Sequence, residues 1–336
     1  MSKVIDQRIT KDYALYHGDC VHVFGGLPDN SLHLGVTSVP FPGMYTYSNS
    51  AFDMGNVTSI KQMVDQTSYL AQEVLRCLIP GRSFFIHLTQ GVAQKQRDGY
   101  MGLRDFRGPM IDMMQAVGFN YYGEITIDKD PQLKAMRTKD HGLMFKSLAT
   151  DSARMHVALP DIVLQFTKPG DNPLPIRAAQ SERYGNDNGW VTNFEWINWA
   201  RPVWYAADYM PGTWRSNHNG DSCKDGIRET DVLNVRQARD TNDERHLCPL
   251  QLGVIERLVK VWSAPDEVVF DPFNGIGSTG YIALKYGRKY IGSELKKSYY
   301  DSSIRNLDSA IAERGALTLF DFAELEQQPQ MELVAT

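Results

Sequence analysis

The chain has 336 residues, which suits one large domain or two of ordinary size. It is 42% hydrophobic and 22% charged, so it can bury a sizeable core, and it has no apolar run near the roughly 18 residues of a membrane span. The net charge of −5 argues weakly against a nucleic-acid partner, because such proteins usually present a basic face.

The first half of the chain alternates apolar strands with helical segments. The polar N-terminus MSKVIDQRITKDY lacks the apolar core of a signal peptide, which predicts cytoplasmic residence. The predicted strands are residues 12–20, 31–38, 83–91, 120–128 and 161–172, and the predicted helices are residues 21–30, 59–79 and 105–119. Ser59 can cap the second helix with Gln62 three positions later, and Pro80-Gly81 is expected to end it. The largely apolar strand 31–38 is expected to be central in a parallel sheet.

Residues 168–245 differ from the rest of the chain, because Gly, Asn, Asp and Pro are frequent and the periodicity fades. Five of the six tryptophans lie here, namely Trp190, Trp196, Trp199, Trp204 and Trp214. We interpret 168–245 as an inserted region between two parts of one domain, 1–167 and 246–314. Residues 315–336 are expected to form an acidic, loosely ordered tail.

Regular structure is predicted to resume after the inserted region. Pro249 can open a helix at its first position. A strand at 267–271, a helix at 278–287 closed by Gly287 and a strand at 289–295 follow. Strands that alternate with helices indicate an α/β sheet with helices on both faces.

A glycine-rich loop, DPFNGIGSTG at 271–280, connects the strand 267–271 to the helix that follows. Gly275, Gly277 and Gly280 satisfy G-x-G-x-x-G, and Glu294 ends the next strand about 20 residues downstream, where an acid can bind ribose hydroxyls. On pattern alone this is a dinucleotide fingerprint, or a tight turn without a ligand. Few residues follow Glu294, so the other strands must come from the N-terminal side, which weakens the interpretation as a dehydrogenase. Asp271 could meet a cationic or amino group, which a pyrophosphate does not supply.

The strand 31–38 ends in an unusual tetrapeptide, Ser38-Val39-Pro40-Phe41. TSVPF resembles the catalytic [DNS]-P-P-[YF] motif of amino-methylating DNA methyltransferases. VVFDPFNGIGSTGYIALKYGRKYIGSEL is similar to their S-adenosylmethionine loop and following strand, LYHGDC to the segment before the catalytic motif, and ERHLCPLQLGVIERLV to their helix-entry segment. The catalytic motif comes first and the cofactor loop last, which is the β-type, circularly permuted order of the family. YTYSNSAFDMGN and KDPQLKAMRTKDHGLMFKSLATDSAR further resemble phage and prophage members.

This resemblance implies a Rossmann-like, permuted methyltransferase sheet with an inserted target-recognition region. It also implies S-adenosyl-L-methionine as cofactor, double-stranded DNA as partner, and a role in restriction-modification or phage DNA protection within a bacterial or phage-infected cell. Both monomers and homodimers occur in the family. The implied cofactor-binding residues are Asp19, Cys20, His246, Pro249, Asp271, Pro272, Phe273, Gly275, Gly277, Ser278, Thr279 and Glu294.

The tetrapeptide would act on an exocyclic amino group, which is a poor nucleophile because its lone pair is delocalised. Ser38 Oγ and the carbonyl of Val39 could accept its two protons, and Phe41 could stack on a flipped base. Val39 departs from the family, which usually has proline there, but Pro40 still favours extended backbone at residue 39. A turn without chemistry and a degenerate, inactive site are the alternatives. A serine in the first position favours cytosine N4, without deciding against adenine N6.

Cations that could bind phosphates cluster after residue 128. The candidate DNA-binding residues are Lys129, Lys134, Arg137, Lys139, Lys146, Arg154, Arg201 and Arg215. Neighbouring aspartates dilute the cluster, so a solvated loop is the alternative, and a small local core is the alternative for the tryptophan-rich region. The cysteines form no CxxC pair and the histidines, including His87, have no ligand spacing, so we expect no metal and interpret the histidines as structural.

Three functions therefore compete. The leading one is an S-adenosylmethionine-dependent DNA methyltransferase for cytosine N4 or adenine N6. The others are a catalytically degenerate homologue that binds DNA or cofactor, and a NAD-dependent oxidoreductase, which explains the glycines but not TSVPF. An RNA or protein substrate is a lesser alternative.

Overall fold

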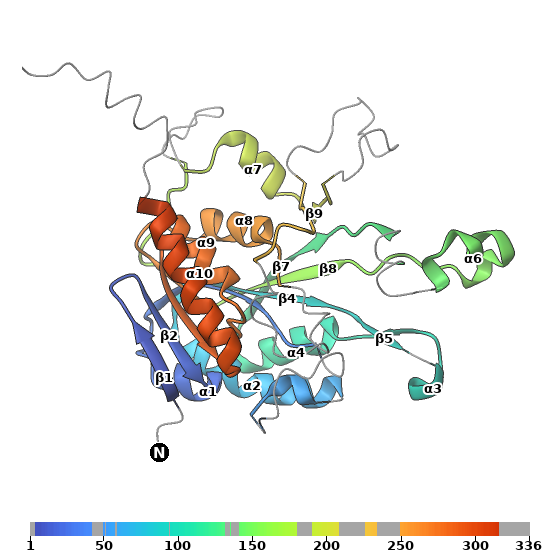
Figure 1. Ribbon diagram of the computed structural model, residues 1–336, viewed down its shortest axis with the longest axis horizontal. Helices are drawn as coiled ribbons and strands as arrows, with labels where there is room; N and C mark the ends of the chain where they lie inside the picture. The colour runs from blue at the N-terminus through green and yellow to red at the C-terminus, as the bar shows by residue number, and fades with distance from the viewer. Residues whose placement is uncertain are drawn as a thin grey trace, which may run out of the picture.

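The computed structural model describes residues 4–41, 50, 52–57, 59–93, 95–131, 135, 141–179, 190–207, 226–233 and 249–315. Its described part is built on a nine-stranded sheet in the order β1-β2-β11-β10-β3-β4-β8-β7-β9, with helices on both faces (Figure 1). None of its helices is long and apolar enough to cross a membrane. The predicted α/β architecture is confirmed.

The strands of the main sheet are β1 Val4–Ile9, β2 Tyr13–Gly18, β3 Leu32–Ser38, β4 Leu78–Thr89, β7 Asn120–Ile127, β8 Asp161–Thr167, β9 Val203–Trp204, β10 Val268–Asp271 and β11 Lys289–Glu294. A hairpin of β5 Gly91–Ala93 and β6 Gly102–Arg104 forms a second sheet. The helices are α1 Cys20–Gly25, α2 Ile60–Cys77, α3 Lys95–Asp98, α4 Arg107–Val117, α6 Phe145–Thr150, α7 Asn193–Trp199, α8 Leu252–Trp262, α9 Ser278–Lys285 and α10 Lys297–Gly315.

The middle of the main sheet is parallel. β3 pairs in parallel with β10 and with β4, and β11 pairs in parallel with β10 and with β2. β8 runs antiparallel to β4 and to β7. The carboxyl ends of β3, β10 and β11 therefore meet at one edge, where β7 also ends and β8 begins. We name this the carboxyl edge; in open α/β sheets it is where ligands bind.

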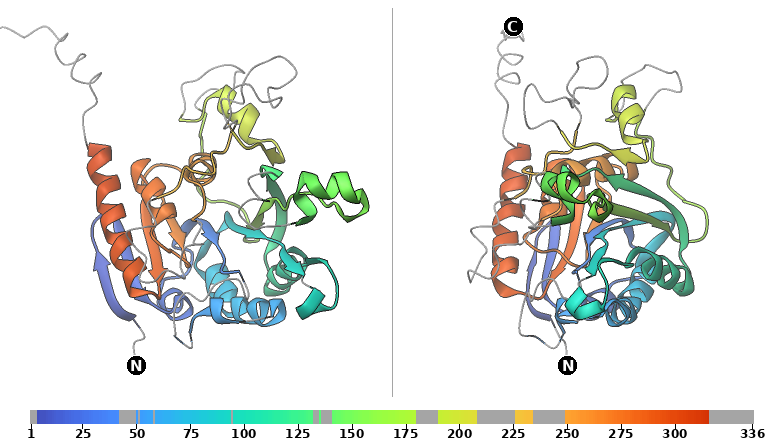
Figure 2. Two further views of the ribbon diagram at one scale, coloured as in Figure 1. Left: turned by 45° about the vertical axis from the view of Figure 1, so that its right-hand side comes forward. Right: turned by 90° about the vertical axis from the view of Figure 1, so that its right-hand side faces the viewer.

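Two apolar cores hold the layers together. One lies under α1, α2 and α4, and the other under α8, α9 and α10, so the two helix sets cover opposite faces of the sheet (Figures 1 and 2). Neighbouring side chains of a strand point to opposite faces, so Phe84 enters the first core and Phe85 the second. Gly35 on β3 lies between Phe84 on β4 and Phe270 on β10, and a Cβ there would come within 2.3 Å of Phe84 and 2.4 Å of Phe270. Glycine there lets these two rings stack over β3.

Helix boundaries follow local chemistry, with two corrections. Ser59 caps α2 by accepting from Gln62 N, as predicted. The helix ends at Cys77, however, and Pro80-Gly81 lies inside β4, so this pair does not end it. Helix α8 starts at Leu252 with Gln251 as N-cap. Pro249 lies two residues before that cap, and the predicted first helical position was wrong.

Part of the tryptophan-rich region joins the main sheet. β9 pairs in parallel with β7, with Trp204 opposite Ile127. Trp204 is 1% exposed and packs in the core beneath α8, whose Arg257 guanidinium lies 4.9 Å from its ring centroid. Trp204 is thus a core residue of the main sheet, while the boundaries 168 and 245 stay a prediction.

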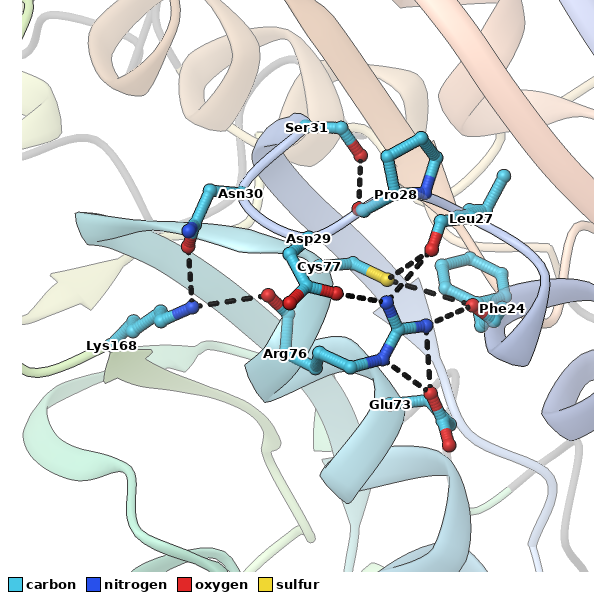
Figure 3. Close-up of polar contacts among 10 residues, drawn as sticks. All are labelled: Phe24, Leu27, Pro28, Asp29, Asn30, Ser31, Glu73, Arg76, Cys77 and Lys168. Atoms are coloured by element: carbon cyan, nitrogen blue, oxygen red, sulfur yellow. Dashed lines mark hydrogen bonds and ion pairs between the residues drawn. The ribbon is translucent and has the colours of Figure 1, made fainter.

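The loop that leads into β3 is held by Arg76 near the end of α2 (Figure 3). The Arg76 guanidinium donates to Phe24 O at 3.0 Å, Leu27 O at 2.8 Å and Asp29 Oδ1 at 2.5 Å. Its Nε donates to Glu73 Oε2 at 2.9 Å. One planar side chain therefore satisfies carbonyls at the end of α1 and fixes the entry to the central strand.

We expect Arg76→Ala to lower the free energy of unfolding by about 1–2 kcal/mol, because it removes the charge-assisted hydrogen bonds that tie Phe24 O and Leu27 O to α2. Lys61→Ala on the same helix removes an exposed pair with Asp65 and should cost no more than about 0.5 kcal/mol. Urea unfolding monitored by circular dichroism measures both. Equal effects of the two substitutions would contradict a special role for Arg76.

Candidate active site

The predicted tetrapeptide begins at the carboxyl end of β3. Ser38 is partly buried, and its Oγ lies 2.8 Å from His87 Nδ1 on β4. Phe41 is also partly buried, with its ring centroid 6.3 Å from that of His87. Val39 is 2% exposed, and its N–H donates to His87 O at 3.3 Å, one residue beyond the last β3–β4 pair. A proline could not make this bond, so valine extends the ladder by one residue into the motif.

Asp271, at the end of β10, joins the glycine loop to β3. Its Oδ1 accepts from Thr37 Oγ1 at 2.6 Å and from Phe273 N at 2.9 Å, and its Oδ2 lies 3.0 Å from Thr279 Oγ1. Thr37 directly precedes Ser38. Two segments that lie more than 230 residues apart in the chain are therefore hydrogen-bonded neighbours.

The glycines of the loop have backbone conformations that other residues rarely adopt. Gly275 has φ 55° and Gly277, which begins α9, has φ 88°. A Cβ at Gly277 would come within 2.5 Å of Ser303 Oγ, so this glycine is needed for packing. A Cβ at Gly275 would meet nothing closer than Phe273 O at 4.0 Å. Gly275 therefore presents an open backbone face that a ligand could approach.

Glu294 ends β11 beside this loop. Gly275 N donates to its Oε2 at 2.7 Å and Lys296 N to its Oε1 at 2.8 Å. Burial raises the pKa of Glu294 to about 7, with Asp53 and Asp271 adding to the rise. Burial likewise raises the pKa of Asp271 to about 6, against the lowering effect of its hydrogen bonds. Each Glu294 oxygen keeps a further lone pair for a ligand hydroxyl.

The remaining predicted cofactor residues have mixed positions. Asp19 is buried and caps α1, accepting from His22 N at 3.1 Å, with His22 Nδ1 at 2.6 Å. Cys20 is buried, and burial raises the pKa of its thiol. Ser278 and Thr279 open α9, and Pro249 lies in the segment that leads into α8. His246 lies outside the described residues.

A buried polar group that the sequence did not reveal lies behind Ser38. His87 Nε2 is 3.4 Å from Asp161 Oδ2, and Lys129 Nζ is 2.6 Å from the same oxygen. The sequence predicts a structural His87 and a phosphate-binding Lys129, but Lys129 is only 8% exposed and ion-paired. Phosphate contact needs an accessible cation, so the assignment of Lys129 to DNA was wrong. No sequence spacing predicts that His87, Asp161 and Lys129 meet, because the register of the strands brings them together.

The other candidate DNA contacts divide into two sets. Lys146 and Arg154 are exposed and lie in or just after α6, which projects away from the sheet between β7 and β8 (Figures 1 and 2). Arg154 pairs with Asp151 at 3.0 Å, and Arg201 is exposed before β9. Lys134, Arg137, Lys139 and Arg215 lie outside the described residues.

Fold and loop together define a methyltransferase of the S-adenosylmethionine-dependent class. The chain matches the N6/N4 DNA methylase family over residues 32–305 and belongs to it. The type II methyltransferase M.BglII from Bacillus subtilis is 23% identical over 85% of this chain and 66% of its own length. M.ScaI from Streptomyces caespitosus is 23% identical over 89% of this chain and 83% of its own length. Family membership rules out the oxidoreductase alternative.

Solved structures show the same fold. A Thermus thermophilus protein complexed with S-adenosyl-L-methionine aligns with TM-score 0.60 and 21% identity over 88% of this chain and 93% of its own. The cytosine-N4-specific PvuII DNA methyltransferase aligns with TM-score 0.54 and 18% identity over 96% of this chain and 94% of its own. The methyltransferase sheet that the resemblance implied is confirmed.

We expect the raised pKa of Glu294 to make the protein less stable as pH rises from about 4.5 through about 7. In this range the folded protein keeps the Glu294 proton that the unfolded chain has released. The resulting stabilisation is fully present below pH 4.5, the pKa of Glu294 in the unfolded chain, and is lost above about pH 7, its pKa in the folded protein. One pKa unit is worth about 1.4 kcal/mol, so a rise from 4.5 to about 7 corresponds to a loss of roughly 3–4 kcal/mol.

Glu294→Gln removes this titration and nothing else that titrates. The difference in free energy of unfolding between the two proteins should therefore shift in favour of the glutamine variant from about pH 5 to about pH 8. Urea unfolding at several pH values measures it. A difference that stays constant over this range would contradict a raised pKa at Glu294.

Proposed function

We propose that the chain transfers a methyl group from S-adenosyl-L-methionine to an exocyclic amino group, cytosine N4 or adenine N6, in double-stranded DNA. The observation that carries this proposal is the 2.6 Å hydrogen bond from Thr37 to Asp271. It holds the serine of the tetrapeptide beside the glycine loop, as a transfer between two bound molecules requires. We place the reaction in the cytoplasm of a bacterial or phage-infected cell.

The loop residues fit the proposed cofactor. The open face of Gly275 allows close approach of a ligand to the backbone, and the free lone pairs of Glu294 suit the two ribose hydroxyls. Asp271, Phe273 and Gly277 would border the methionine part, and buried Asp19 the adenine side. When bound, the cofactor supplies an electrophilic methyl group on a positively charged sulfur.

Ser38, Val39 and Phe41 would handle the base. Ser38 Oγ and the Val39 carbonyl accept the two amino hydrogens, so the nitrogen lone pair is freed from the ring and can face the methyl group. The hydrogen bond from Val39 N to His87 O supports extended backbone there, the geometry for which the family usually uses proline. Phe41 offers a flat face, and stacking on such a face is worth about 1–3 kcal/mol.

A paired base cannot reach a half-buried serine at a sheet edge, so the base would be flipped out of the duplex. α6, with Lys146 and Arg154, and the exposed Arg201 would lie along the phosphates. Relatives include both base classes: PvuII methyltransferase is cytosine-N4-specific, while Escherichia coli YhdJ, an adenine methyltransferase, is 36% identical over 20% of this chain and 23% of its own length. The proposal therefore covers both amino groups.

Ser38→Ala should lower methyl transfer at least about 100-fold, because one of two proton acceptors is lost. Phe41→Leu should lower it about tenfold through weaker stacking. DNA from cells that express each variant is sequenced with detection of both modified bases, which also identifies base and context. Ser68→Ala on α2 is the matched control and should keep full modification. Modification that survives both site substitutions would refute the assignment, and a wild type without any would favour the degenerate homologue.

Val39→Pro should change the rate of methyl transfer by less than about threefold, because proline and valine both favour extended backbone at this position. Val39→Gly should lower it at least about tenfold, since glycine frees the backbone that aims the carbonyl. Single-turnover rates measure both variants on an unmethylated DNA duplex that carries the sequence found methylated in cells. A large gain with proline would show that valine aims the carbonyl poorly.

A further inference from the structure

Four polar side chains, three of them buried, form a continuous group on β3, β4 and β8 and just after β7. Ser38 Oγ lies 2.8 Å from His87 Nδ1, His87 Nε2 lies 3.4 Å from Asp161 Oδ2, and Lys129 Nζ lies 2.6 Å from that same oxygen. His87, Asp161 and Lys129 are 6%, 9% and 8% exposed. We call these four residues the Ser38 relay. Only its serine end is partly open to the site.

Strand register explains why the four residues meet. Each stands two positions from an apolar residue of the core beneath α8 and α9, so all four continue the same face of the sheet. These apolar neighbours are Val36, Phe85, Val163 and Ile127. Ser38 is directly opposite His87, and Asp161 is opposite Thr89, diagonal to His87. At the carboxyl edge the apolar stripe therefore gives way to one row of polar groups.

Folding alone gives little reason for this row. A buried ion pair gains little over well-packed apolar residues of similar volume, because removing both charges from water costs most of their attraction. The same sheet face is filled with apolar side chains up to this point. A polar row that begins where the proposed chemistry begins therefore calls for a role in that chemistry.

The charges of the relay determine which atoms carry protons. Burial alone would raise the pKa of Asp161, but the N–H side of His87 and the Lys129 ammonium outweigh it and hold that pKa below its usual range. An ionised Asp161 only accepts hydrogen bonds, so the side of His87 that faces it carries the proton. His87 Nε2 is buried and makes no hydrogen bond among the described residues, and Asp161 Oδ2, at 3.4 Å, is the acceptor placed to orient it. Nδ1 is then a lone-pair acceptor, and Ser38 must donate to it.

We propose that His87, oriented by Asp161 and Lys129, is the positioning residue of the methyl transfer and takes up, through Ser38, the proton that the amino group loses. This inference rests on the proposed function. It explains how a serine can serve in place of a carboxylate: a hydroxyl that accepts a proton must pass its own proton on. Because Ser38 donates to His87, its lone pairs remain directed to the amino group.

The step balances without any further reactant. The amino nitrogen forms the new bond to the methyl carbon with its lone pair, and the electron pair of the broken carbon–sulfur bond stays on sulfur. One amino proton moves to Ser38 Oγ as the serine proton moves to His87 Nδ1. The imidazolium lies between Ser38 and the Asp161 carboxylate, and it returns its proton to solvent once product leaves.

Single-turnover kinetics test the coupling between Ser38 and His87. His87→Asn keeps an acceptor near the Nδ1 position but cannot take a proton, so the rate should fall about 100-fold or more, and its decline towards low pH should disappear. The double variant Ser38→Ala/His87→Asn should be no slower than Ser38→Ala alone, because both changes break one relay. His33→Asn, at the opposite end of β3, is the control and should keep the wild-type pH profile. If the double variant loses the product of the two single losses in rate, the two residues act independently and the proposal is overturned.

A second readout does not depend on activity. In the free protein, nitrogen chemical shifts of His87 should show the proton on Nε2, and Asp161→Asn should move that proton towards Nδ1. Calorimetry should show S-adenosylmethionine binding unchanged by His87→Asn. A proton on Nδ1 in the wild type would overturn the relay directly. If the wild-type protein carries the proton on Nε2 but methylates no DNA, the proposed function is refuted, and the proton-transfer role of His87 with it.

Discussion

The hydrogen bond between Thr37 and Asp271 is the interaction on which the rest of the site depends. Asp271 is 5% exposed, and a carboxylate so deeply buried is tolerable only when donors surround it. Thr37, Phe273 and Thr279 supply them, from β3, the glycine loop and α9. One buried acceptor thus fixes the relative position of the tetrapeptide strand, the loop and the helix that follows it.

This constraint also explains how a chain with its loop last can form the same sheet. β10 arrives near the C-terminus but inserts beside β3, in the middle of the parallel strands. What the chemistry requires is adjacency at the carboxyl edge, and Thr37 and Asp271 provide it whichever segment comes first. The loop can therefore come last in this chain and still meet the tetrapeptide at the carboxyl edge.

Much of the fold could be predicted because its signals are local. Apolar runs, the Ser59 cap and the glycines each act over a few residues, and the tetrapeptide is contiguous. Strand β1 was not predicted, because most of its side chains are exposed and show no apolar pattern. Pro249 was predicted to start a helix. Helix α8 instead starts at Leu252, whose N–H donates to Asp231 O, a residue distant in the chain. The Ser38 relay could not be predicted, since it exists only once four segments are in register.

Lys129 shows most clearly why sequence charge misleads. It stands in a run of cations that suggests a phosphate-binding loop, yet it begins that run only two residues after β7 ends. Two residues beyond Ile127 it still faces the core, so its charge is directed to Asp161 rather than to DNA. A cation placed there balances the charge of the carboxylate, and the pair lies where it can orient His87. An isolated aspartate or an isolated lysine at this depth would instead leave a buried charge without a partner.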